Sequence, residues 1–228
     1  MIPLRDSEAE RRLTPANTLL IAANLAVFAL EVQLGAGAGR ELAGFAMIPA
    51  DVSRAHAVVR EARVLETLVT SMFLHAGLLH VAGNMLYLFI FGPAVEERLG
   101  HLRFFAFYLI AGIVAGLATV AMDPESQVAV IGASGAIAGV LGAYLVLFPA
   151  ARITTILPIF VFVQFVEIPA IFYLLFWFAI QLYSGLASGA AGPLVGGVAW
   201  WAHVGGFLFG VAAGPLLAKR PAARRRRR

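Results

Sequence analysis

Long stretches without aspartate, glutamate, lysine or arginine dominate the chain. These charge-free runs are 13–30, 67–95, 104–122, 126–151, 153–166 and 168–218. A transmembrane helix needs about 20 mainly apolar residues, so the run 153–166 is too short, whereas 168–218 is long enough for two helices. Within that last run, the small residues and the proline of 188–193 provide a turn signal. The pattern predicts six transmembrane helices, at about residues 15–34, 73–93, 103–121, 132–149, 168–186 and 197–218.

Composition agrees with this pattern and excludes two other classes of protein. Of the 228 residues, 61% are hydrophobic and 13% are charged, whereas a soluble domain has about 25% charged residues. Disordered chains are poor in apolar residues and rich in charge, which is the opposite composition. The sequence therefore predicts an all-α membrane protein whose main solvent is lipid.

The positions of the basic residues predict the orientation. Three arginines come before the first helix and seven basic residues follow the last one: Arg5, Arg11, Arg12, Lys219, Arg220 and Arg224 to Arg228. Because cytoplasmic flanks carry the excess of Lys and Arg, both termini are expected in the cytoplasm, which requires an even number of spans. We therefore expect a cytoplasmic N-terminal segment (1–14), a six-helix membrane domain (15–218) with a long first loop at about 35–70, and a basic cytoplasmic tail (219–228). The polar residues 1–12 do not match a signal peptide, so the first helix is expected to be retained.

The basic tail has two interpretations, nucleic-acid binding and contact with lipid. A polybasic segment next to a transmembrane helix is attracted to the anionic lipids of the cytoplasmic leaflet. We favour the second interpretation, which makes the lipid bilayer the partner of the tail, and we expect no nucleic-acid partner.

Four polar residues fall inside the predicted helices, where polar groups are costly and commonly functional. They are His80 and Asn84 in the second helix, Ser134 at the start of the fourth, and His203 in the sixth. His80 and Asn84 are four residues apart and therefore share one face of their helix. Ser134 and His203 each lie six or seven residues inward, counted from residues 128 and 196, or about 10 Å at a helical rise of about 1.5 Å per residue. These two side chains are therefore expected at the same depth below the outer surface.

Small residues at steps of three or four are expected to bring the fourth and sixth helices into close contact. The fourth helix carries Gly135, Gly139 and Gly142, and the sixth carries Ala199, Gly206, Gly210 and Gly214. Such contact would let Ser134 reach His203. A serine hydroxyl becomes a nucleophile when a neutral histidine takes its proton. No acid lies near His203 in the sequence, so the pair predicts a Ser-His dyad without a third, acidic residue. His80, Asn84 and the backbone N–H of Ser134 are candidate donors for an oxyanion hole.

Other interpretations of these residues stay open at this stage. A serine in a Gly- and Ala-rich helix is commonly a packing residue, and His80 and Asn84 can bond across helices. In a small transporter, His80 and His203 would relay protons, although the sequence shows neither paired acids at mid-membrane nor recognisable inverted repeats. The chain has no cysteine, and its five histidines form no ligand cluster with acids, so we expect no metal and no other cofactor.

Several segments in a fixed order carry a family resemblance. They are Phe73-Leu74-His75, His80 to Met85, Val95 to Gly100, Gly132-Ala133-Ser134-Gly135, and Ala202 to Gly206 with Gly210 beyond. Together they cover about residues 67–215, and the ordered set resembles the rhomboid family of intramembrane serine proteases, whose core has six helices.

This resemblance implies a role for each of the four polar residues. Ser134 would be the nucleophile and His203 the general base and acid, with His80, Asn84 and the Ser134 amide as the oxyanion hole. The resemblance also implies that Glu96 and Arg98 are structural. The substrates would be transmembrane segments of membrane proteins, cut near the outer face of a bacterial cytoplasmic (inner) membrane. Some relatives are inactive and only bind membrane helices, but these lack the serine or the histidine, and this chain has both.

The sequence also departs from the family pattern. Ala138 stands where some members carry an aromatic residue that packs on the catalytic histidine, and Trp200 or Trp201 is a candidate to replace that support. A Trp-Arg pair found in the first loop of some members is missing. In the fifth helix, an aromatic group is a candidate gate for substrates: Phe172, Phe176 and Trp177.

Overall fold

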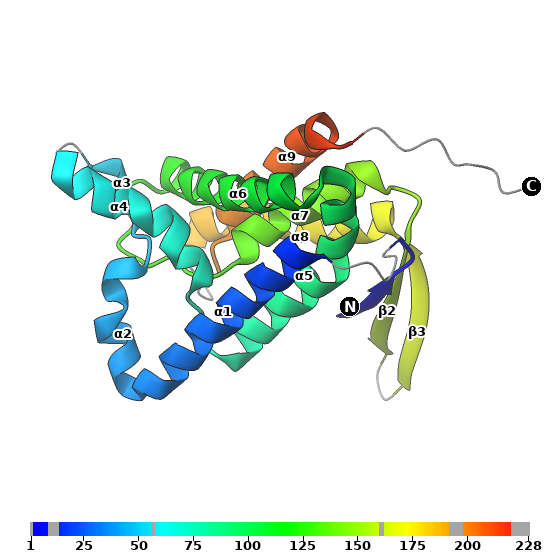
Figure 1. Cartoon of the computed structure of the whole chain (residues 1–228), viewed down its shortest axis with the longest axis horizontal. Coiled ribbons are helices and arrows are strands. Elements are labelled where there is room, and N and C mark those ends of the chain that lie inside the picture. The colour runs from blue at the N-terminus through cyan, green and yellow to red at the C-terminus, as the bar shows by residue number, and fades with distance from the viewer. Residues whose placement is uncertain (1, 9–13, 56–57, 160–161, 192–197, 220–228) are drawn as a thin grey trace, which may run out of the picture.

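The computed structural model describes residues 2–8, 14–55, 58–159, 162–191 and 198–219. Six longer helices make up the body of the protein (Figure 1): α1 (Pro15–Leu34), α5 (Leu78–Leu99), α6 (His101–Met122), α7 (Ser134–Leu147), α8 (Ala170–Ala191) and α9 (Trp200–Leu217). Five of them are long and apolar enough to cross a membrane, and α7 is a shorter apolar helix. Each of the six predicted transmembrane helices therefore corresponds to a helix of the structure, with shifts at its ends, but only five of the six have the length of a span. The largest shifts are in the second predicted helix, which runs from Leu78 to Leu99 rather than from 73 to 93.

Short helices fill the long first loop between α1 and α5. They are η1 (Gly35–Gly37), α2 (Ala38–Glu41), η2 (Ala43–Phe45), α3 (Pro49–Ser53), α4 (Val58–Thr70) and η3 (Ser71–Phe73). This loop is tied to the segment that follows α6. Ser53 Oγ donates to the carbonyl oxygen of Pro124 over 2.7 Å, Arg54 pairs with Glu125, and Met47 forms a β-bridge with Val130. The first loop therefore helps to place the chain that leads into α7.

The expectation of an all-α protein was wrong, because the described residues include a three-stranded antiparallel sheet. Its strands are β1 (Ile2–Asp6), β2 (Arg152–Ile159) and β3 (Phe162–Pro169), in the order β1-β2-β3. The apolar run 153–166, too short for a transmembrane helix, supplies the β2–β3 hairpin, and its β-branched residues favour strands. Because β3 extends to Pro169, the fifth predicted helix begins at Ala170 instead of residue 168. Part of the predicted N-terminal segment 1–14 is the strand β1, which pairs with β2.

The start of α1 and the end of α9 lie at the same end of the helix bundle. The fully buried carboxylate of Glu96, near the end of α5, accepts hydrogen bonds from the backbone N–H groups of Ala16 (3.1 Å) and Asn17 (2.6 Å). The backbone N–H of Lys219, just after α9, donates to the carbonyl oxygen of Arg98 over 2.8 Å. This arrangement fits an even number of crossings; the side of the membrane on which this end lies stays a prediction, and residues 220–228 of the basic tail lie outside the described part of the chain.

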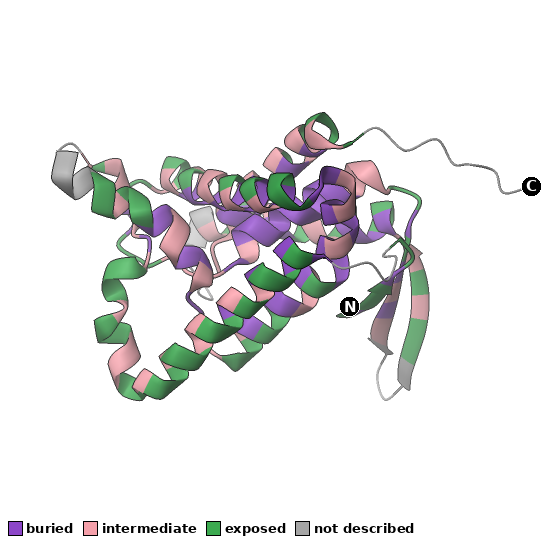
Figure 2. Ribbon diagram, viewed as in Figure 1, coloured by how far each residue is buried: buried purple, intermediate pink, exposed green. Residues whose placement is uncertain are grey.

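Helix α7 lies at the centre of the bundle, and the buried residues concentrate around it (Figure 2). The predicted glycine stripes do bring α7 and α9 together. A Cβ atom on Gly206 would collide with the carbonyl oxygen of Gly135, and a Cβ on Gly210 would collide with that of Gly139. Because these positions have no side chain, the two backbones approach directly. This contact sets the distance between the groups that each helix carries.

Candidate active site

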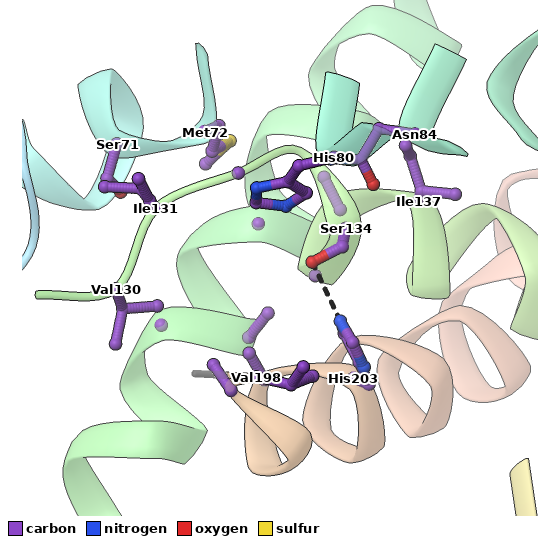
Figure 3. Close-up of a pocket in the computed structure, with 18 of the residues that line it drawn as sticks. Ser71, Met72, His80, Asn84, Val130, Ile131, Ser134, Ile137, Val198 and His203 are labelled. Atoms are coloured by element: carbon purple, nitrogen blue, oxygen red, sulfur yellow. Dashed lines mark hydrogen bonds between the residues drawn. The ribbon is translucent and has the colours of Figure 1, made fainter. Parts of the chain in front are cut away.

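Ser134 and His203 come together at the starts of their helices. Ser134 is the first residue of α7, and His203 lies in the first turn of α9. Ser134 Oγ is 2.8 Å from His203 Nε2, a hydrogen-bond distance, and Figure 3 shows the two side chains pointing toward each other. The residues before Ser134 are not helical, so the depth estimate from a helical rise was wrong for this helix. The proximity it was meant to support is nevertheless observed.

Aromatic rings flank the His203 imidazole. The ring of Trp177, from α8, lies 5.8 Å away between centroids, and the ring of Trp200 lies 6.2 Å away, edge-on. Ala138 is completely buried beside Gly206, where the helix contact leaves no room for an aromatic side chain. The support expected from Trp200 is thus present as a ring contact, and Trp177, expected only as part of a gate, provides a second one.

A residue that the sequence analysis missed completes the surroundings of His203. Gln181, in α8, places Oε1 2.7 Å from His203 Nδ1. In the sequence, Gln181 is a single amide within a mainly apolar helix. Its position one helical turn after Trp177 is the signal that could have pointed to it. The sequence analysis considered only an acidic partner for His203, and Gln181 is neutral.

His80 and Asn84 converge on the backbone of Gly132, two residues before Ser134. Gly132 has a φ of +112°, a left-handed conformation that favours glycine. A Cβ atom there would lie 2.6 Å from His80 Nε2 and 3.5 Å from Asn84 Nδ2. Its backbone N–H donates to the carbonyl oxygen of Ser71 over 2.9 Å, which holds the turn in place. The missing side chain leaves the space beside both nitrogen atoms open, and Figure 3 shows His80 and Asn84 on the side of Ser134 opposite His203.

The hydrogen bonds around His80 and Asn84 define what the two nitrogen atoms can donate. The backbone N–H of Ala76 donates to His80 Nδ1 over 3.4 Å, so a neutral ring carries its proton on Nε2. Asn84 Nδ2 is buried and has no hydrogen-bond partner among the described residues. The N–H groups of His80 Nε2 and Asn84 Nδ2 therefore lie beside the same glycine, and the unsatisfied amide of Asn84 can donate to a group that enters the cavity.

His75, in the segment before α5, supports the position of His80. The two rings meet edge-on with centroids 5.0 Å apart. The backbone N–H of His75 donates to both carboxylate oxygens of Glu31 in α1, at 3.1 and 3.2 Å. Burial, followed by the nearby His80, lowers the pKa of the His75 side chain to about 4. His75 is therefore neutral at pH 7 and ties the start of α5 to α1.

These groups share one cavity. Its volume is about 580 Å³, and its polar lining includes His80, Asn84, Ser134, Gln181 and His203. Most of the remaining lining is apolar or glycine, from the first loop, α6 and the segment 129–132. The described residues contain no group of three or more His, Cys, Asp or Glu side chains that could hold a metal ion.

Comparison with known proteins explains this constellation. The sequence profile of the Rhomboid domain matches residues 62–220, more than half of the chain. The chain belongs to the rhomboid family. It is accordingly a multi-pass membrane protein, and all four polar residues of the site fall within the matched rhomboid domain.

Named relatives of this rhomboid come from bacteria, plants and fungi. It is 45% identical to Rhomboid protease GluP of Bacillus subtilis over 78 residues, which are 34% of this chain and 15% of that protein. It is 34% identical to RHOMBOID-like protein 6, mitochondrial, of Arabidopsis thaliana over 154 residues, 68% of this chain and 44% of that one. It is 32% identical to Rhomboid protein 1, mitochondrial, of Saccharomyces cerevisiae over 168 residues, 71% of this chain and 44% of that one. The chain thus spans less than half the length of each of these relatives.

Proposed function

We propose that this rhomboid is an intramembrane serine endopeptidase that uses a Ser134–His203 dyad. The observation that carries the proposal is the 2.8 Å hydrogen bond between Ser134 Oγ and His203 Nε2, in a cavity that His80 and Asn84 also line; Asn84 Nδ2 has no hydrogen-bond partner among the described residues. A nucleophile bonded to a base, with donors facing the same space, is the geometry that acyl transfer requires.

The chemistry follows from these contacts. His203 Nε2 takes the hydroxyl proton as Ser134 Oγ attacks the carbonyl carbon of a peptide bond. Negative charge then develops on the carbonyl oxygen. His80 Nε2–H, Asn84 Nδ2–H and the Ser134 backbone N–H would stabilise it; the last belongs to the first residue of α7, where an N–H has no acceptor within its own helix.

The second half of the reaction returns the enzyme to its starting state. The imidazolium of His203 gives its proton to the departing amine, and the C–N bond breaks to leave an acyl-enzyme on Ser134. A water molecule, deprotonated by His203, then attacks the ester carbon and releases the carboxylic acid product. Both steps use the same base and the same donors, so no further titratable group is required.

The substrates that fit this site are transmembrane segments of membrane proteins. A peptide bond inside an intact helix is enclosed by its own hydrogen bonds, so the substrate must expose an extended segment before attack. The site lies at the end of the bundle where α5, α7 and α9 begin, away from the start of α1 and the end of α9. With both termini in the cytoplasm, cleavage takes place near the outer face, and the host membrane is a bacterial cytoplasmic membrane. We retain the proposal that an aromatic group of α8 forms the gate through which substrates enter: Phe172, Phe176 and Trp177.

A fluorophosphonate probe tests the proposal directly, because it reacts only with an activated serine. We expect labelling of the purified protein in lipid vesicles, together with cleavage of a membrane-anchored reporter. Ser134→Ala and His203→Ala should each abolish both signals. Ser188→Ala should keep them, because the Ser188 hydroxyl donates to the carbonyl oxygen of Gly185 within α8. Full reporter cleavage by Ser134→Ala would overturn the proposal. Absence of both signals in the wild-type protein would favour one of the alternatives, a helix-binding protein or a transporter.

A further inference from the structure

Gln181 is a buried polar residue in a helix of mainly apolar composition. Its exposed fraction is 6%, and it lies in the middle of α8, a helix long and apolar enough to span a membrane. A buried amide is costly unless its donor and its acceptor are both satisfied. The amide nitrogen and the amide oxygen of Gln181 each have a hydrogen-bond partner.

The two hydrogen bonds of Gln181 define the orientation of its amide. Nε2 donates to the carbonyl oxygen of Trp177, one turn earlier in α8, over 3.3 Å. Because a backbone carbonyl can only accept, the amide nitrogen belongs on that side, and Oε1 faces His203 Nδ1 at 2.7 Å. An amide oxygen can only accept as well, so Nδ1 of His203 must carry a proton.

This proton on Nδ1 decides what the other ring nitrogen can do. In a neutral imidazole with a proton on Nδ1, Nε2 has a free lone pair. That lone pair faces Ser134 Oγ at 2.8 Å, where a general base is needed. The opposite tautomer would point an N–H at the hydroxyl group and could not take its proton.

We propose that Gln181 is a positioning residue that holds His203 in the tautomer and orientation required to deprotonate Ser134. The inference rests on the proposed protease function and deepens it, because the site then has a third member that bears no charge. In serine proteases with a triad, a carboxylate orients the histidine in this way. Here a neutral amide does so without burying a charge in the membrane, where an unpaired charge is strongly unfavourable.

The location of Gln181 makes the dyad depend on α8. Ser134 and His203 come from α7 and α9, whose backbones are in direct contact, whereas Gln181 and the Trp177 ring come from α8. A displacement of α8 from α9 would break the Gln181–His203 hydrogen bond and remove a ring that packs on the imidazole. The base is therefore held in its working orientation only while α8 is packed against α9.

Kinetics of three variants test this role. Gln181→Met keeps the size of the side chain and removes both hydrogen bonds, and we expect kcat to fall about tenfold or more with KM unchanged, since one net hydrogen bond of about 1.4 kcal/mol corresponds to a factor of ten. Gln181→Glu restores an acceptor for Nδ1 and should recover most of the loss. Ser188→Ala removes a comparable hydrogen bond from a side chain to the backbone of α8, donated to Gly185 O over 2.9 Å, and should match the wild type.

The tautomer itself can be measured in the wild-type protein. In wild-type protein with isotope-labelled histidine, the nitrogen chemical shifts of His203, assigned by their loss in His203→Ala, should show a proton on Nδ1 and none on Nε2 at neutral pH. In Gln181→Met the two tautomers should be mixed. A wild-type His203 protonated on Nε2, or a folded Gln181→Met variant with wild-type kcat, would overturn the inference.

The same experiments separate this inference from the proposed function. If wild-type protein labels with the fluorophosphonate and Ser134→Ala does not, the protease function holds whatever Gln181 does. If wild-type protein neither labels nor cleaves, the function itself fails and the role of Gln181 fails with it.

Discussion

The hydroxyl group of Ser134 lies 2.8 Å from Nε2 of His203, although 69 positions separate the two residues in the chain. Each residue stands at the start of a helix, and the two helices touch through glycines that a side chain would force apart. The chemistry of the site therefore depends on packing one and two turns away from it. The predictions that follow probe this packing and the groups around the dyad.

Adding a methyl group between α7 and α9 should disable the site from a distance. In Gly210→Ala the new Cβ meets the carbonyl oxygen of Gly139, and we expect a loss of about 1–3 kcal/mol of stability from overpacking, together with reduced fluorophosphonate labelling. Gly39→Ala is the matched control, because its Cβ would meet nothing within 4 Å. Thermal unfolding and labelling rates measure both effects; a Gly210→Ala protein with wild-type labelling would contradict this account of the packing.

Removing one donor from the proposed oxyanion hole should slow the chemical step. Asn84→Asp keeps the shape of the side chain but replaces the N–H donor, which has no partner among the described residues, with an acceptor. The loss of one such donor lowers kcat by about 100- to 1000-fold, and we expect KM to change little. Reporter kinetics with Asn84→Ala alongside will separate the lost donor from the added charge. A wild-type kcat in both variants would exclude Asn84 from the hole.

Neutralising Glu96 should weaken the start of α1 without touching the site. The buried carboxylate accepts the backbone N–H groups of Ala16 and Asn17, and Nδ1 of His101 lies 2.5 Å from it. Hydrogen bonds to a charged group contribute about 1.5–3 kcal/mol, so Glu96→Gln should unfold at a clearly lower temperature while the folded fraction keeps its labelling. The exposed Glu66→Gln serves as the control, and equal unfolding temperatures for the two variants would disprove the role of Glu96.

Stability should fall as the pH is lowered from 6.5 toward 4, in part because of His75. Its pKa is lowered to about 4 in the folded protein from an ordinary value of 6.5. Between these pH values the His75 side chain is protonated in the unfolded chain and neutral in the folded protein. His75 therefore stabilises the fold fully above pH 6.5, and this contribution falls by up to about 1.4 kcal/mol per pH unit on acidification.

Denaturant unfolding at pH 7 and pH 5 measures this effect. Replacing His75 by Asn, which does not titrate, should reduce the difference between the two pH values. An unchanged difference would show that other groups, among them His80, account for the whole dependence.

Much of this protein was predictable because lipid restricts what a sequence can do. In a bilayer the backbone must satisfy its own hydrogen bonds, so long charge-free runs become helices. Against that background the few polar residues stand out, and Ser134, His203, His80 and Asn84 line one cavity as expected. The strand β1 was missed because its partner β2 is far away in the sequence, and pairing between Ile2 and Ile156 leaves no local pattern. The β2–β3 hairpin is local, and its β-branched residues were a signal that a test for transmembrane length alone does not detect.

The sequence by itself determined that the surroundings of this protein are largely lipid, where its long apolar helices lie and which types of residue are available for chemistry, because these depend on composition and on local periodicity. Tertiary structure alone decided which of those residues meet. The contact between α7 and α9 brings Ser134 to His203, and the packing of α8 on α9 brings Gln181 to the other side of the same ring. A hydrogen bond requires two atoms within about 3 Å, and that distance is set by packing between helices rather than by spacing along the chain.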